Sequence, residues 1–337
     1  MTNSINTGTS YFGSRILRHV KADMRKLKYQ GFDFVIHTFS EYDYTYHRGN
    51  IADIVDVTHE SGLKVYLDPW GVGNVFGGEP FSDFVTEHFQ DSCQLLDNGQ
   101  RVHLACPNAP EFQRFMQDWL TVAITTGADG ILWDEPHFHS PSHLKGQSGR
   151  WGCRCEHCQK IFMTKNAKPL SQIEDDQVRA FRIESLVAFL ESLSVRSSAA
   201  GLQNILFLTA DQPAETVYRD WQHYAKIRSL DVISTGPYWM WAGLPLESVR
   251  DYALILKRIA TENSKDHLFW IQCCKIKAER NAEIRQAIEM AHQSGMCNFA
   301  LWGFEGCAAE SWIACDNPAQ AWRTAISAFN SLKHKLT

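Results

Sequence analysis

The chain has 337 residues, of which 44% are hydrophobic, enough for one large α/β domain or two smaller ones with a sizeable core. It carries 33 basic and 38 acidic residues, a net charge of −5, without long runs of one sign. This balance excludes intrinsic disorder and gives no sign of a surface for nucleic acid or an anionic membrane, so we expect a neutral or weakly charged partner.

The N-terminal residues MTNSINTGTSYFG lack the basic and apolar regions of a signal peptide. No uncharged apolar run approaches the roughly 18 residues that a spanning helix needs. We therefore expect a cytoplasmic protein without a membrane partner. In a reducing compartment the ten cysteines are expected to be buried thiols or metal ligands, because a disulfide scaffold is typical of short secreted chains.

Strand-like and helix-like segments alternate along nearly the whole chain, which is the pattern of βα units around a parallel sheet. In the first unit, a strand over 10–14 precedes a helix over 15–31, where Ile16, Val20 and Met24 recur at helical spacing. The other expected strands cover 32–40, 63–68, 128–136, 204–211, 230–239, 267–275 and 297–306. The other expected helices cover 51–62, 110–126, 175–199, 246–263, 281–294 and 317–332.

About eight such units predict a (β/α)8 TIM barrel, formed by residues 1–337 as a single catalytic domain. A barrel takes about 250 residues. The surplus falls in two long loops, 69–107 and 136–174, after the third and fourth strands and therefore on the face where barrel enzymes carry their active sites. A doubly wound open sheet is the alternative, but no G-x-G-x-x-G follows the first strand and no P-loop is present.

Acidic residues follow many of the expected strands, where barrel enzymes place their functional groups. The candidates are Glu41 and Asp43 after the second strand, Asp68 after the third, Asp134 and Glu135 after the fourth, Asp211 after the fifth, and Glu305 after the eighth. A single acid such as Asp43, Asp68 or Asp211 is equally well explained as a helix cap or an ion-pair partner. The adjacent Asp134 and Glu135 have no simple structural explanation and are the best catalytic candidates.

Aromatic residues accompany these acids. Carboxylates bind sugar hydroxyls and catalyse glycosidic cleavage, and aromatic rings stack on the apolar faces of sugars, so we expect a small carbohydrate as substrate. Trp133 is expected in the barrel wall, whereas Trp70, Trp239 and Trp302 have loop positions that suit stacking. The residues expected to bind the sugar are Glu41, Asp68, Trp70, His137, Tyr238, Trp239 and Trp302.

Residues 153–158 read CRCEHC, and thiolates so closely spaced can share one tetrahedral ion. The fourth ligand must come from elsewhere in the chain. Cys106 in the neighbouring long loop is the first candidate, and His157 is the second. The sequence favours a structural zinc in the loop insertion at about 136–174 over free thiols or a transient disulfide.

The order ACPN (105–108), an acid pair closing the fourth strand, and C-x-C-x-x-C with Phe162 four positions later resembles the catalytic barrel of glycoside hydrolase family 42 β-galactosidases and related barrel hydrolases. The resemblance covers roughly residues 100–165. It implies a (β/α)8 barrel and a glycosidase activity. It also implies a zinc bound by Cys106, Cys153, Cys155 and Cys158, and Glu135 as the acid/base beside Asp134, where the family carries Asn.

Two departures separate the chain from that family. The family places a nucleophilic Glu at the end of the seventh strand, where this chain reads FWIQCCKIKAER and offers Gln272 but no carboxylate before Glu279. Asp134 also stands where the family has Asn, so a carboxyl group replaces the amide that is expected to hydrogen-bond a sugar hydroxyl. β-Galactosidase activity itself is therefore not implied.

Glycoside cleavage needs a protonated carboxyl at the leaving oxygen and a second carboxylate as nucleophile or base. We expect Glu135 to be the acid, because pairing with Asp134 raises one of the two pKa values. For the second carboxylate, Glu305 is the first choice, Asp211 the second, and Asp134 itself the third.

Other functions are compatible with the sequence. HFH at 137–139 is similar to the His-x-His of metal-dependent hydrolases, which carry it at the first strand. A zinc thiolate attacking a sugar is a further alternative, although a fourth cysteine ligand argues against it. The missing seventh-strand carboxylate suits a barrel that binds carbohydrate without cleaving it, and a zinc-ribbon nucleic-acid module is least favoured. The sequence does not define the oligomeric state, and a homo-oligomer is compatible with it.

Overall fold

Eight parallel strands close into a barrel, and at least one helix lies between each strand and the next along the chain. The structure is a computed structural model that describes residues 4–139, 151–170, 175–210 and 214–335. The strands follow in chain order around the barrel, and the last pairs with the first. They are β1 (Asn6–Tyr11), β2 (Phe34–Thr38), β3 (Lys64–Asp68), β6 (Gly130–Trp133), β7 (Gln203–Phe207), β8 (Val232–Thr235), β9 (Asp266–Gln272) and β10 (Asn298–Trp302). The predicted (β/α)8 barrel is confirmed.

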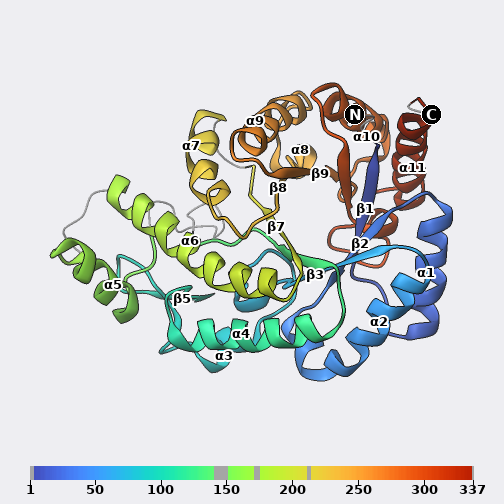
Figure 1. Ribbon diagram of the computed structural model, residues 1–337. Helices are drawn as coiled ribbons and strands as arrows, with labels where there is room; N and C mark the ends of the chain where they lie inside the picture. Colours follow the sequence, from blue (N-terminus) through green and yellow to red (C-terminus); the bar gives the residue numbers. More distant parts are fainter. Residues whose placement is uncertain (1–3, 140–150, 171–174, 211–213, 336–337) are drawn as a thin grey trace.

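The helices form a ring around the strands (Figure 1). The longer ones are α1 (Leu17–Tyr29), α2 (Arg48–Glu60), α4 (Pro110–Thr125), α5 (Glu156–Asn166), α6 (Asp175–Ala199), α7 (Ala214–Ala225), α9 (Ser248–Glu262), α10 (Ala282–Gln293) and α11 (Pro318–His334). Two short helices, α3 (Asp83–Glu87) and α8 (Trp239–Ala242), lie in loops after β3 and β8. None of the described helices combines the length and the apolar composition that a bilayer crossing requires.

Alternation along the strands divides the buried side chains into two groups. In β3 and β6, Val65 and Ile131 belong to the large core between strands and helices, whereas Tyr66 and Leu132 belong to a second cluster inside the barrel. Side chains two positions farther along the same strands therefore face the barrel mouth. The acids Asp68 and Asp134 hold these positions, so the barrel itself positions the site described below.

The first strand begins earlier than predicted, at Asn6 and not at residue 10. Its sequence NTGTSY is small and polar, so its hydrophobic pattern is weak. The strand is nonetheless buried, and a Cβ atom on Gly8 would lie 2.0 Å from the ring of Phe34, which fills the barrel interior. Only a residue without a side chain fits there.

The sequence prediction also missed α7, although Val217, Trp221 and Tyr224 lie on one buried face at helical spacing. The long loop after β3 contains a hairpin, β4 (Cys93–Leu95) with β5 (Arg101–Ala105). The loop after β6 contains α5. Figure 1 shows α5 and β5 at one side of the molecule, beyond α6.

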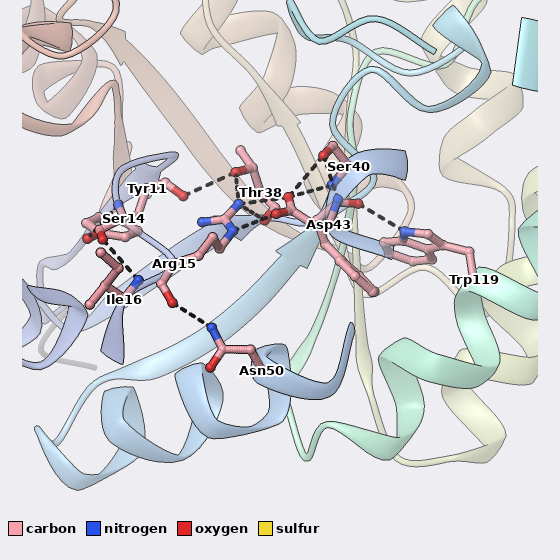
Figure 2. A network of polar contacts seen from close by, with 10 residues as sticks. Tyr11, Ser14, Arg15, Ile16, Thr38, Ser40, Asp43, Asn50 and Trp119 are labelled. Carbon is pink, nitrogen blue, oxygen red and sulfur yellow. Dashed lines mark hydrogen bonds and ion pairs between the residues drawn. The ribbon is translucent and has the colours of Figure 1, made fainter. Parts of the chain in front are cut away.

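A polar network joins the turn after β1 to the end of β2 (Figure 2). The guanidinium of Arg15 donates to both carboxylate oxygens of Asp43 at 2.7 and 2.8 Å and to the carbonyl of Thr38 at 2.8 Å. Ser40 donates to Asp43 through its amide and its hydroxyl. Burial alone would raise the pKa of Asp43, but Arg15 and Ser40 hold it below its ordinary value. Asp43 is therefore a structural ion-pair partner.

Candidate active site

A cavity of about 520 Å³ opens at the carboxyl end of the barrel. Its lining comes from the ends of six strands and the loops that follow them. The lining residues are Asp68, Gly78, Glu79, Leu132, Asp134, Glu135, Thr209, Ala210, Gly236, Tyr238, Trp241, Ala242, Trp270 and Trp302. It therefore brings together Asp68, Asp134, Glu135, Tyr238 and Trp302 from the residues proposed on sequence.

Asp68, the last residue of β3, is fully buried at 0% exposure. Neither of its carboxylate oxygens has a hydrogen-bond partner among the described residues. Burial raises the pKa of Asp68 well above its ordinary value, and the neighbouring charges of Glu135 and Glu79 raise it further. Asp68 is thus an unsatisfied carboxyl facing a cavity, an arrangement that costs folding free energy and that a ligand can relieve.

Asp134 and Glu135 both line the cavity, although strand alternation would send adjacent side chains to opposite faces. Glu135 has a φ of +42°, a left-handed conformation that a residue with a side chain rarely adopts. This left-handed turn interrupts the alternation of side-chain directions after Asp134, so that the side chain of Glu135 lies on the same side as that of Asp134. Backbone strain of this kind concentrates at functional sites, so it supports a role for the pair.

The glycine-containing loop after β3 packs against the pair. The amide of Gly77 donates to the carbonyl of Asp134 at 3.0 Å. A Cβ atom on Gly77 would lie 2.6 Å from Oδ2 of Asp134 and 3.1 Å from Oε2 of Glu135, so both carboxylates crowd the same point. Burial raises the pKa of Asp134 well above its ordinary value, and Asp68 and Glu135 raise it further. The crowding therefore opposes the simultaneous ionisation of these carboxyl groups.

Glu79 also lines the cavity and is an acid that was not predicted from the sequence. Glu79 lies in the sequence GGEP (77–80), within the long loop 69–107 that was expected on this face of the barrel. A carboxylate between two glycines and a proline in such a loop was the sequence signal that could have identified it. Partial burial raises the pKa of Glu79, Glu310 adds to this rise, and Lys275 opposes it.

The aromatic side of the cavity differs in part from the prediction. Tyr238 and Trp302 line it as expected, and Trp241 and Trp270 join them. Trp239 does not, because it is fully buried and its indole nitrogen donates to Glu283 at 2.8 Å. In α8, a residue two positions after Trp239 points to a different side, which places Trp241 in the cavity.

Trp70 lies behind the cavity lining. It stacks on Phe12 at 5.8 Å between ring centres and contacts Trp302 at 6.3 Å, so it supports the lining from outside. His137 also lies outside the lining, with its Nδ1 atom 2.7 Å from the carbonyl oxygen of Glu135.

Two predicted acids are engaged elsewhere. Glu41 accepts hydrogen bonds from the amides of Gly73 and Phe84 and from the hydroxyl of Ser82, and so it holds the loop after β3 in place. Glu305 forms an ion pair with Lys26 of α1 and does not line the cavity, so the structure does not support it as the second catalytic carboxylate. Asp211 lies outside the described residues.

The end of β9 carries an amide where the family 42 pattern has a carboxylate. Gln272 accepts a hydrogen bond from the amide of Met240 and donates to the carbonyl of Cys274. Both ends of this side chain are therefore engaged by backbone groups. Gln272 stabilises the loops after β8 and β9 and is not presented to the cavity lining.

The four cysteines named from the sequence come together. Cys106, Cys153, Cys155 and Cys158 are all buried, and their sulfur atoms lie within 4.8 Å of one another. The amide of Cys155 donates to the sulfur of Cys153, and the side chain of Asn108 donates to the sulfur of Cys158. Among the described residues, this is the one group of three or more His, Cys, Asp or Glu that is placed to hold a metal ion.

No protein-family model and no curated protein sequence matches the chain. Its fold does match solved structures. The endo-1,4-β-mannanase from Rhizomucor miehei is 11% identical with a TM-score of 0.61, over 98% of this chain and 95% of that one. The endo-β-1,4-mannanase from Thermotoga petrophila is 12% identical with a TM-score of 0.56, over 98% and 77%.

A D-psicose 3-epimerase from Clostridium cellulolyticum H10 is 11% identical with a TM-score of 0.51, over 98% of this chain and 99% of that one. At such identities the likeness shows the barrel fold alone, and the neighbours are named for different reactions. The fold therefore does not determine the function of the chain, and the resemblance to family 42 stays a prediction.

Replacing Asp68 by Asn should stabilise the protein by about 1–2 kcal/mol at pH 8, because it removes a buried carboxylate without partners. Because the pKa of Asp68 is raised in the folded protein, the unfolded state loses this proton first, and the stability of the wild-type protein falls as pH rises above about 4, the ordinary aspartic range. The gain in Asp68→Asn should therefore shrink toward that pH. Urea unfolding at both pH values measures it. Asp53→Asn, at an exposed site of α2, is the control, and a loss of stability in Asp68→Asn would contradict the account.

Proposed function

We propose that the protein is a glycoside hydrolase that uses carboxylate acid/base catalysis. The observation that carries this proposal is the arrangement of the cavity, in which Asp134 and Glu135 converge with the buried Asp68 across from four aromatic side chains. An aromatic surface stacks on the apolar face of a sugar ring, and carboxyl groups reach its hydroxyls and its glycosidic oxygen. The mannanase neighbours are compatible with this proposal.

In the proposed mechanism, Asp134 and Glu135 form the catalytic pair. The raised pKa of Asp134 supports Asp134 as the proton donor, and the proposal assigns the ionised form to Glu135. Asp134 then protonates the leaving glycosidic oxygen, and Glu135 acts as the nucleophile or as the base for water. This assignment differs from the prediction made from the sequence, in which Glu135 is the acid, as the family resemblance also implies. A negative charge on Asp68 would raise the pKa of Asp134 further.

A second candidate is a barrel that binds carbohydrate without cleaving it. Gln272 favours it, because the position that carries the nucleophile in family 42 is an amide engaged by backbone groups. Binding of sugars without turnover of any glycoside would select this candidate.

Glu135→Gln should lower kcat by about 10³-fold or more on any glycoside that the wild-type protein cleaves, because the variant loses the charged partner of the pair. The measurement is turnover of a panel of aryl glycosides. Far-ultraviolet circular dichroism checks that the variant is folded, and Glu87→Gln, at an exposed position of α3, is the matched control. Near-wild-type turnover by Glu135→Gln would refute the mechanism.

We further propose that the four cysteines bind a structural zinc ion. The distances from the sulfur of Cys106 to those of Cys158 and Cys155 are 3.4 and 3.6 Å, close to the sulfur spacing of about 3.8 Å in a tetrahedral zinc site with bonds of about 2.3 Å. The hydrogen bonds that the sulfurs of Cys153 and Cys158 accept suit thiolate ligands. All four ligand positions are then taken by protein, so the ion has no open position for catalysis.

The cysteine cluster connects the loop after Glu135 to the rest of the site. The segment after residue 150 pairs with the end of β4, with the amide of Arg154 donating to Leu95 at 2.7 Å. Gln94 of β4 in turn accepts a hydrogen bond from the amide of His139 at 3.0 Å. A zinc ion would therefore fix the chain on both sides of the long loop that begins at Glu135.

The purified protein should contain about one zinc ion per chain, and Cys155→Ser should lose it. Loss of the ion should lower Tm by about 5–10 °C, because metal binding contributes directly to folding free energy. Elemental analysis and calorimetric melting are the measurements. Cys297→Ser, at a partly exposed cysteine outside the cluster, should keep both the metal and Tm. Metal-free protein with an unchanged Tm would refute the zinc site.

A further inference from the structure

The cavity holds more acidic side chains than glycoside cleavage needs. Four carboxylic acids line it, namely Asp68, Glu79, Asp134 and Glu135, and its described lining contains no lysine, arginine or histidine. A retaining or inverting glycosidase needs two carboxyl groups at the scissile bond. If Asp134 and Glu135 supply those two, Asp68 and Glu79 remain to be explained.

Asp68 is the more informative of the two. It is fully buried, both of its oxygens lack a partner, and the charges that act on it come from other acids, Glu135 and Glu79. Hydroxyl groups of a neutral sugar can donate hydrogen bonds to it. A cationic group can do this too and also neutralises the charge, which matters most where water is excluded.

The opposite side of the cavity also suits a cation. Tyr238, Trp241, Trp270 and Trp302 present aromatic surface there, and aromatic faces attract cationic groups. One of these rings already contacts a cation of the chain itself, because the ammonium group of Lys275 lies 4.4 Å from the ring centre of Trp241 and 3.5 Å from that of Trp312. Tyr238, Trp270 and Trp302 are the other aromatic side chains of the lining.

The indole nitrogen of Trp270, a residue of the cavity lining, is a further polar atom without a partner in the described part of the chain. It is buried and has no hydrogen-bond partner among the described residues. Its N–H group needs an acceptor, which a sugar hydroxyl supplies. The site therefore lacks a positively charged donor at Asp68 and an acceptor at Trp270.

A metal ion explains these features less well. In the part of the chain that the structure describes, the carboxylates of the cavity do not form a group of three or more placed to hold an ion, whereas the four cysteines do. The ligand that satisfies both Asp68 and Trp270 must also be large enough to reach across the cavity.

We propose that the substrate is an amino sugar glycoside, whose protonated amino group pairs with Asp68 while its ring lies against the aromatic side chains. That the amino sugar is cleaved rests on the proposed glycosidase function. The preference for binding an amino sugar does not depend on turnover. Asp68 is then a specificity-determining residue.

The test compares three hexosamines with their parent hexoses: glucosamine with glucose, galactosamine with galactose, and mannosamine with mannose. Binding is measured by isothermal titration calorimetry at about pH 6, where the amino groups carry a proton. At least one hexosamine should bind about tenfold or more tightly than its hexose. Asp68→Asn should remove this preference, and Asp53→Asn should keep it.

Calorimetry in two buffers of different ionisation enthalpy gives a second readout. A cation that pairs with Asp68 favours its ionised form, so hexosamine binding should release protons to the buffer in the wild-type protein and release fewer in Asp68→Asn. A merely structural role for Asp68 would not produce this difference.

Three results would overturn the inference: equal affinity within every pair, no binding of any hexosamine, or a preference that survives in Asp68→Asn. Turnover of neutral aryl glycosides that depends on Glu135 would then leave the glycosidase proposal standing without the amino sugar. Conversely, an amine preference lost in Asp68→Asn without any turnover would support the amino sugar site on a barrel that only binds.

Discussion

The site depends on the crowding of carboxyl groups at one side of the barrel mouth. Asp68 and Asp134 end neighbouring strands and both face inward, and the left-handed turn at Glu135 adds a third acid. Like charges that are crowded together oppose one another's ionisation, so each carboxylate raises the pKa of its neighbours. The proposed acid, the proposed charged partner and the proposed preference for a cationic ligand all follow from this constraint.

The rest of the fold supports this arrangement. The loop after β3 packs Gly77 against both carboxylates, and Glu41 anchors the same loop from below through two amides and a hydroxyl. The hairpin β4–β5 and the cysteine cluster hold the chain that follows Glu135. The ends of β3 and β6 therefore place Asp68 and Asp134, and the two long insertions pack around them. Strands β9 and β10 and the segment after β8 contribute the aromatic side.

The sequence predicted what regular periodicity and local motifs encode. The alternation of strand and helix segments predicted the barrel. The carboxyl ends of the strands indicated Asp68 and Asp134, and the close cysteine spacing predicted the cysteine cluster. It did not predict which side of a short helix or turn faces the cavity, so Trp241 and not Trp239 lines it, and Glu305 turns away to Lys26. These outcomes depend on tertiary packing of loops, for which a single sequence carries no periodic signal.

The most direct measurement is the protonation state of Asp134, which needs no substrate. Infrared difference spectra between the wild-type protein and Asp134→Asn, recorded across a pH series, isolate the carboxyl band of this group and of those coupled to it. We predict that a protonated carboxyl persists at neutral pH, well above the ordinary aspartic range of about 4. A carboxyl band that disappears completely by about pH 5 would contradict the crowded, proton-sharing site on which the account rests.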